Sequence, residues 1–262
     1  MANLCSGYLS LISRKSIEEP YRYIRNNLVA SITVLRAAGE YGIQKVILAS
    51  SSSVYGDSAI QRNQDVPGVN LLGCGEKYQV AQPLSPYAMT KRAMELSGYT
   101  YHKLYGYDVI IPRFFTVYGE AGRPDMAYFK FIRKLYHGKS IDVYGDGRQL
   151  RDFTYIDDIV DGLMALREVE GYEIINLGSS NPISLNTMID HIKDYLAIVD
   201  IDINYSEIQA GDVWATYADI TKAKDILNWT PQWSFDDGIH ETVRWYRENH
   251  ETLKEDYEIN FE

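Results

Sequence analysis

The stretch Lys45-Val-Ile-Leu-Ala49 runs directly into Ser50-Ser-Ser-Ser53. Its short run of branched apolar residues predicts a strand buried on both faces, as in a parallel sheet. The serine cluster predicts the end of that strand, and ligands of α/β sheets bind beyond such ends. We therefore expect Ser51 and its neighbour Ser52 to lie beside a ligand, with the polar start of a loop as the alternative interpretation.

The segments around this strand alternate between helix and strand. Apolar residues recur at helical spacing over 20–41, which predicts an amphipathic helix. Ser85-Pro86 is typical of a helix start and Gly106 of a helix end, so we predict a second helix over 87–105. Residues 108–115 have the composition of another strand. This alternation predicts an α/β fold with a parallel sheet.

Shorter elements follow Gly119 and predict a second, smaller lobe that interleaves with the first. We expect a helix over 126–137, a hairpin-like stretch over 141–155, and a helix capped by Asp157 or Asp158. The other expected elements are a strand over 173–177 and helices over 185–196 and 238–249. Residues 57–83 form a long irregular loop, which is typical of a lid or an insertion.

The composition excludes several classes of protein. The chain has 26 Lys and Arg against 36 Asp and Glu, a formal charge of -10, which disfavours nucleic acid as a partner. Cys5 and Cys74 lie far apart in the sequence, so we expect neither a disulfide framework nor a metal site. This use of cysteine favours a reducing, cytoplasmic location. No apolar run approaches the roughly 18 residues of a membrane span, so we expect no membrane association.

Tyr87 and Lys91 share one face of the predicted helix because they are four residues apart. A nearby ammonium favours the phenolate and lowers the pKa of a tyrosine, which makes the phenol a usable base. A hydroxyl at Ser51 could hydrogen-bond a reacting alcohol or carbonyl oxygen. The three residues are therefore candidates for a proton-transfer set, with chance surface placement as the alternative for the two helical residues.

Five ordered motifs resemble those of the extended short-chain dehydrogenases, the NAD-dependent epimerase/dehydratase family. They are Ala49-Ser-Ser-Ser-Ser-Val-Tyr-Gly56, Pro86-Tyr-Ala-Met-Thr-Lys91, Arg113-Phe-Phe-Thr-Val-Tyr-Gly119, Gly122-Arg-Pro-Asp-Met126 and Gly145-Asp-Gly-Arg-Gln-Leu-Arg-Asp-Phe-Thr-Tyr-Ile-Asp-Asp158. Within that family, the resemblance is to NAD-dependent nucleotide-sugar 4-epimerases acting on UDP-glucuronate. It implies an incomplete Rossmann-like doubly wound sheet in residues 1–120, and a smaller α/β lobe, mainly in 121–262, that binds the sugar nucleotide.

The resemblance also implies the roles of individual residues. Tyr87 would act as base and then acid on the sugar 4-OH, Ser51 would assist it, and Lys91 would tune Tyr87 and hold the ribose of NAD. The carried-over substrate-binding positions are Arg14, Ser52, Thr116, Arg123, Arg151 and Asp212. Dehydratases of the family place Asp-Glu just before Val-Tyr-Gly, where this chain has Ser52-Ser53, so epimerisation is the expected reaction.

The sequence departs from the family pattern at its start. The family begins with a strand, a Gly-x-x-Gly-x-x-Gly turn and a helix that hold the NAD pyrophosphate, and this chain has no such turn. We expect the first βαβαβ to be missing, which would expose the edge of the 45–49 strand and favour a homo-oligomer or completion by another chain. Three interpretations stay open: a truncated epimerase, a degenerate homologue that binds a UDP-sugar without turnover, or a subunit completed by a partner.

Overall fold

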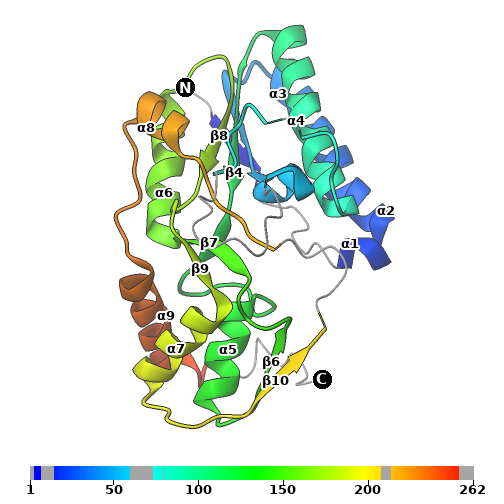
Figure 1. Cartoon of the computed structure of the whole chain (residues 1–262). Coiled ribbons are helices and arrows are strands. Elements are labelled where there is room, and N and C mark those ends of the chain that lie inside the picture. The colour runs from blue at the N-terminus through cyan, green and yellow to red at the C-terminus, as the bar shows by residue number, and fades with distance from the viewer. Residues whose placement is uncertain (1–2, 7–14, 60–72, 79, 208–213, 254–262) are drawn as a thin grey trace.

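The computed structural model describes residues 3–6, 15–59, 73–78, 80–207 and 214–253. Within these residues a parallel five-stranded sheet forms the upper part of the molecule in Figure 1. Its strands are β1 (Asn3–Ser6), β2 (Lys45–Leu48), β3 (Ser50–Ser51), β4 (Asp108–Phe114) and β8 (Tyr172–Leu177).

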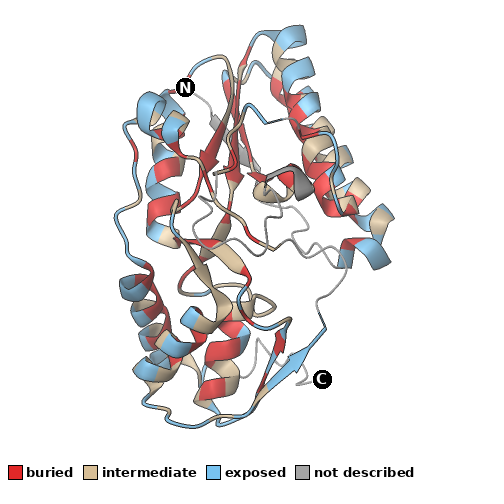
Figure 2. Cartoon of the chain, in the orientation of Figure 1, coloured by how far each residue is buried: buried red, intermediate tan, exposed pale blue. Residues whose placement is uncertain are grey.

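The strand predicted from the apolar run at 45–49 lies in the middle of this sheet. β2 pairs with the first half of β4 and β3 pairs with its second half, so the two form one strand line that is interrupted at Ala49. Val46 and Leu48 belong to one apolar cluster and Ile47 to another on the opposite face. This alternation explains why every residue of β2 is buried, as Figure 2 shows for the central strands.

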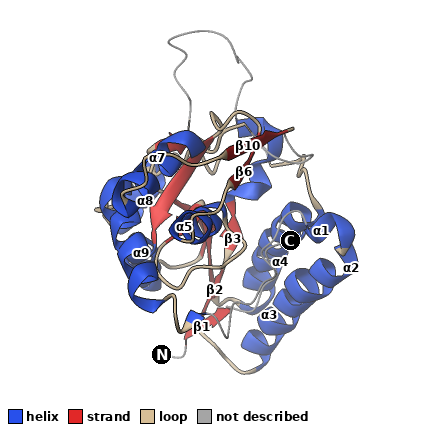
Figure 3. Ribbon diagram, turned by 90° about the horizontal axis from the view of Figure 1, so that it is seen from below, coloured by secondary structure: helices blue, strands red, loops and turns tan. Residues whose placement is uncertain are grey.

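Helices cover both faces of the sheet. In Figure 3, α3 (Ala30–Glu40) and α4 (Pro86–Tyr105) lie on one side of the strands and α8 (Thr221–Leu227) on the other. The helix predicted over 20–41 is present as consecutive segments with a π-helical middle. They are α2 (Pro20–Tyr23), η1 (Ile24–Val29) and α3, preceded by the single turn α1 (Lys15–Glu18).

The lower lobe has its own apolar core. β7 (Leu150–Tyr155) pairs with β5 (Thr116–Tyr118) and β9 (Pro182–Ser184), and β6 (Ile141–Tyr144) pairs with β10 (Ile203–Ser206). The helices packed around this core are α5 (Ala127–Tyr136), α7 (Leu185–Leu196) and α9 (Phe235–Asn249). The chain returns to the upper sheet between these elements, because β8 pairs with β4.

Two details of the lower lobe differ from the sequence prediction. The expected hairpin over 141–155 is wrong, because β6 and β7 pair with different strands that lie elsewhere in the sequence. The expected cap at Asp157 or Asp158 is also wrong. Helix α6 (Ile156–Ala165) has Tyr155 as its N-cap, and Asp158 in its first turn accepts hydrogen bonds from the backbone of Gln232 and Trp233.

The edge of β2 is not exposed, contrary to the expectation from the sequence. β1 pairs with it in parallel, from Asn3 beside Lys45 to Ser6 beside Leu48. The prediction failed because the short segment at 3–6 was not identified as a strand. Among the described strands, β1 itself pairs with β2 alone.

Parts of the expected 57–83 loop are packed against the protein. After the short helical segment η2 (Ser52–Ala59), residues 73–78 run beside residues 217–219, where the Cys74 backbone exchanges hydrogen bonds with Tyr217 and Asp219. The remaining short element is η3 (Leu166–Glu168), which follows α6. No helix of the described residues is long and apolar enough to cross a membrane.

Candidate active site

A cavity of about 500 Å³ lies beyond the carboxyl ends of β3 and β4, beside the loop that leads from β5 to α5. Its lining residues lie between Ala49 and Ile156 at the start of α6. Five of the residues singled out from the sequence line it: Ser51, Ser52, Tyr87, Thr116 and Arg123. Residues from four separate segments of the sequence thus share one cavity.

The serine cluster is held in place by its own hydrogen bonds. Ser51 ends β3, where it pairs with Phe114 of β4. Its hydroxyl accepts from the backbone N–H of Ser53 at 3.2 Å and contacts the Ser53 hydroxyl at 3.1 Å. The tight turn after the strand therefore fixes the Ser51 hydroxyl at the wall of the cavity.

The first turn of α4 places Tyr87 at the same cavity. Ser85 caps the helix by accepting from the Ala88 backbone at 3.1 Å, and Pro86 occupies the first helical position. The backbone N–H of Tyr87 donates to the Ser16 hydroxyl at 3.0 Å, which ties α4 to α1. Tyr87 is 5% exposed, so its phenol is nearly enclosed by protein.

Burial and neighbouring groups act on the pKa of Tyr87. Burial raises the pKa of Tyr87, because the phenolate loses solvation, while a hydrogen bond with Ser51 and the charge of Arg123 act in the opposite direction. Arg123, on the loop between β5 and α5, is a cation that favours the phenolate.

Lys91 lies behind Tyr87 rather than in the wall of the cavity. Its ammonium is 5.7 Å from the centre of the Tyr87 ring and donates to the Ala49 carbonyl at 2.6 Å. Burial lowers the pKa of Lys91 to about 7, with Glu95 acting to raise it. Lys91 therefore bridges α4 to the break between β2 and β3, and its charge is sensitive to pH in the neutral range.

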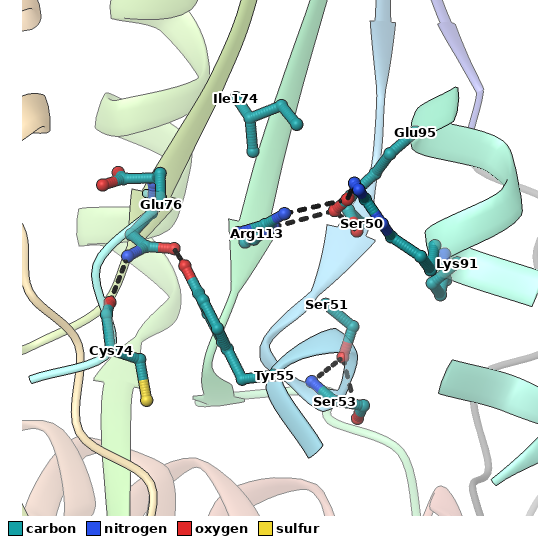
Figure 4. Close-up of polar contacts among 12 residues, drawn as sticks. Ser50, Ser51, Ser53, Tyr55, Cys74, Glu76, Lys91, Glu95, Arg113 and Ile174 are labelled. Carbon is teal, nitrogen blue, oxygen red and sulfur yellow. Dashed lines mark hydrogen bonds and ion pairs between the residues drawn. The ribbon is translucent and has the colours of Figure 1, made fainter. Parts of the chain in front are cut away.

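Glu95 is the residue of this region that sequence reasoning missed. Figure 4 shows its carboxylate between Arg113 and Ser50. It accepts two hydrogen bonds from Arg113 at 2.8 and 2.9 Å, one from the Ser50 hydroxyl at 2.7 Å and one from Arg92 at 2.9 Å. These donors outweigh burial and lower the pKa of Glu95. Its spacing of four from Lys91 was the available signal.

Arg113 links this network to a second one across the sheet. Its guanidinium carbon lies 4.8 Å from the centre of the Tyr55 ring, and the Tyr55 hydroxyl donates to the Asn176 side chain at 2.7 Å (Figure 4). The Asn176 amide donates in turn to the Cys74 carbonyl at 2.6 Å. Buried polar groups thus connect α4, the central strands and the 73–78 segment.

Of the remaining predicted substrate-binding residues, Arg151 is the one that the structure describes. Arg151 on β7 donates to the carbonyls of Leu150 and Trp214, at 2.9 and 3.2 Å, and is not among the lining residues. Its prediction as a substrate-binding residue is not tested by these contacts. Arg14 and Asp212 lie outside the described residues.

The sequence matches the model of the NAD dependent epimerase/dehydratase family over residues 11–178, and the chain belongs to this family. It is 44% identical to a UDP-glucuronate 4-epimerase from Thermodesulfobacterium geofontis over 242 residues, which cover 92% of this chain and 71% of that protein. Two solved structures have the same fold at 30% identity. MoeE5 in complex with UDP-glucuronic acid and NAD superposes with a TM-score of 0.83 over 94% of this chain and 79% of that one. UDP-glucuronic acid 4-epimerase from Bacillus cereus, also with UDP-glucuronic acid and NAD, does so with 0.82 over 92% and 74%.

The cofactor of the family is NAD, and both solved structures contain it. The residues around the cavity fit the reacting end of such a group, because the enclosed Tyr87 phenol, the Ser51 hydroxyl and the Lys91 ammonium lie together at the strand ends. Among the described residues we find no glycine-rich turn between a strand and a helix for the pyrophosphate.

Proposed function

We propose that this chain catalyses the NAD-dependent C4 epimerisation of a UDP-hexuronic acid, interconverting UDP-glucuronate and UDP-galacturonate through a 4-keto sugar. One observation carries the proposal: the Tyr87 phenol, the Ser51 hydroxyl and the Arg123 guanidinium line one cavity. These are the groups that proton transfer at an alcohol and recognition of a carboxylate require. The names of the relatives support the same substrate.

Tyr87 acts as the acid–base group in this proposal. It takes the proton of the sugar 4-OH and later returns it, while Ser51 hydrogen-bonds the C4 oxygen. Burial opposes the phenolate, whereas a hydrogen bond with Ser51 and the charge of Arg123 favour it. Bound NAD would supply the hydride acceptor and donor for C4, so the 4-keto sugar could be reduced on either face. Lys91 would contact the ribose of the cofactor next to Tyr87.

Arg123 gives the site its preference for a uronate. A guanidinium offers a planar fork of N–H donors that matches a carboxylate, whereas the 6-hydroxyl of a neutral hexose can use only one donor. Losing a charge-assisted hydrogen bond costs about 1.5 to 3 kcal/mol. Ser52 and Thr116, which line the same cavity, are the neighbouring polar groups that would contact the sugar.

Calorimetric titration of the chain tests the substrate class. We expect UDP-glucuronate to bind at least about tenfold more tightly than UDP-glucose, in line with one charge-assisted hydrogen bond. Arg123→Leu should remove that preference and leave the affinity for UDP unchanged. Equal affinities of the unmodified chain for the two sugars would contradict the proposal.

We also propose that the chain forms a homo-oligomer in a reducing, cytoplasmic compartment. Met89, Leu96 and Tyr99 are large apolar side chains of α4 that are 40%, 55% and 49% exposed, and covering them with a second copy would stabilise an assembly. The Cys74 thiol is free, which suits a reducing compartment. Sedimentation should show a species of at least twice the monomer mass, and a monomer at every concentration would contradict the assembly.

A further inference from the structure

Arg123 and Asp125 form an ion pair across a tight turn at the edge of the cavity. The turn runs from Arg123 to Met126, whose backbone N–H donates to the Arg123 carbonyl at 3.2 Å. Pro124 occupies its second position, where the fixed φ of proline suits such a turn. The turn therefore brings the Asp125 carboxylate back onto the Arg123 side chain.

Asp125 occupies one edge of the guanidinium. Arg123 Nε donates to Asp125 Oδ1 at 3.1 Å and Nη2 to Oδ2 at 2.9 Å, while Nη2 also approaches the Met126 sulfur at 3.3 Å. Nη1 has no hydrogen-bond partner within the described part of the chain. Arg123 lines the cavity and Asp125 does not, so the guanidinium is held from outside and keeps the Nη1 donors for another partner.

We propose that Asp125 sets the affinity of the cavity for a sugar carboxylate by neutralising part of the charge that Arg123 presents to it. The proposal rests on the proposed function, in which the carboxylate of a UDP-hexuronate binds Arg123. Asp125 is then a specificity-determining residue: it weakens the binding of a uronate and leaves that of a neutral sugar unaffected.

The distances explain why the carboxylate still binds. A ligand carboxylate would contact the guanidinium directly but would be separated from Asp125 by the width of that group. Because the Coulomb energy falls with distance, its attraction to Arg123 exceeds its repulsion from Asp125. Substrate and product carry the same carboxylate. Weaker binding of that carboxylate therefore favours release of the product and binding of new substrate.

An asparagine at position 125 separates this role from simple positioning of Arg123. Asn keeps one acceptor oxygen for the guanidinium but removes the negative charge. If Asp125 only orients Arg123, Asp125→Asn can preserve or weaken the binding of a uronate. If Asp125 neutralises Arg123, the same change tightens it, and misfolding cannot produce a gain in affinity.

The test is a calorimetric titration of the chain and of Asp125→Asn with UDP-glucuronate, UDP-glucose and UDP. We expect Asp125→Asn to bind UDP-glucuronate about fivefold more tightly, the upper range of partly exposed charge pairs, and UDP-glucose and UDP as the unmodified chain does. The gain should shrink at high salt, because the two charges are about one third exposed. Asp157→Asn is the matched control: it removes an exposed carboxylate next to the cavity residue Ile156 and should change nothing.

Two failures can be told apart. If the chain prefers UDP-glucuronate, Arg123→Leu abolishes that preference and Asp125→Asn brings no gain, the role of Asp125 is wrong and the proposed function stands. If the chain binds UDP-glucuronate and UDP-glucose equally and Arg123→Leu changes neither, the proposed substrate is wrong and the role of Asp125 falls with it.

Discussion

Glu95 and Arg113 form a two-pronged ion pair in the interior of the protein, with Nε–Oε1 and Nη2–Oε2 distances of 2.8 and 2.9 Å and at most 1% exposure of either side chain. The pair connects α4 to β4 directly behind the serine cluster. Since Glu95 also accepts from Ser50, the position of the strand end that carries Ser51 depends on it. A charged pair remote from the substrate thus supports the proposed proton-transfer groups.

Removing one partner of this pair should destabilise the fold. Glu95→Gln leaves the Arg113 charge buried without its counter-charge, and such changes cost about 3 to 5 kcal/mol. Arg113→Met alone should have a similar cost, whereas the double variant Glu95→Gln/Arg113→Met should cost clearly less than the sum. Urea denaturation of the four proteins measures this, and additive effects would show that the two residues do not interact.

The lowered pKa of Lys91 should make the stability of the protein depend on pH. Its pKa in the folded protein is about 7 against an ordinary 10.5, so between these values the unfolded state binds more protons and stability rises with pH. Lys91→Met should therefore be more stable than the unmodified chain at pH 7, by as much as about 5 kcal/mol, and the difference should vanish near pH 10.5. A constant difference from pH 7 to 10 would show that Lys91 keeps an ordinary pKa.

Ser51→Ala should move the pH profile of turnover. The hydrogen bond from Ser51 lowers the pKa of Tyr87, so its removal raises that pKa and shifts the rise of kcat to higher pH. The matched variant Ser53→Ala removes a hydroxyl that contacts Ser51 and should leave the profile in place. An unshifted profile with a uniformly lower kcat would assign Ser51 to substrate binding instead.

Replacing Asp152 should destabilise the fold without changing the cavity. Its buried carboxylate accepts from the Ser179 and Ser180 backbone at 2.7 and 3.0 Å and from the Ala218 backbone at 2.9 Å. Asp152→Asn turns an amide N–H toward backbone donors and should cost about 1 to 3 kcal/mol per unsatisfied group. Thermal unfolding should show the loss, while the affinity for UDP-glucose at low temperature should be unchanged.

Much of the fold could be predicted from local sequence signals. The apolar run of β2, the Ser85-Pro86 start of α4 and the left-handed Gly106 at its end each act within a few residues, so they are visible in the sequence. Strand pairing is not local. β6 and β7 lie on either side of Asp146-Gly147, which is a typical turn sequence, but they pair with distant strands. The hairpin prediction was therefore wrong for a reason that no short stretch of sequence contains.

Several residues of the candidate site could be proposed from the sequence, but the contacts that set their charges could not. Tyr87, Ser51 and Arg123 were found through spacing and motifs, and they share a cavity. The sequence could not show that Lys91 is buried against Ala49, or that Arg123 faces Tyr87 from another loop. Both depend on packing between segments that are distant in the sequence.

The most direct test of the account is turnover of UDP-glucuronate by the chain with NAD, followed by separation of the two epimers. We predict formation of UDP-galacturonate, and a rate at least about a hundredfold lower for Tyr87→Phe, as expected for loss of a general acid–base group, with UDP-glucuronate binding retained. An undiminished rate in Tyr87→Phe, or no UDP-galacturonate from the unmodified chain at saturating NAD, would contradict the account.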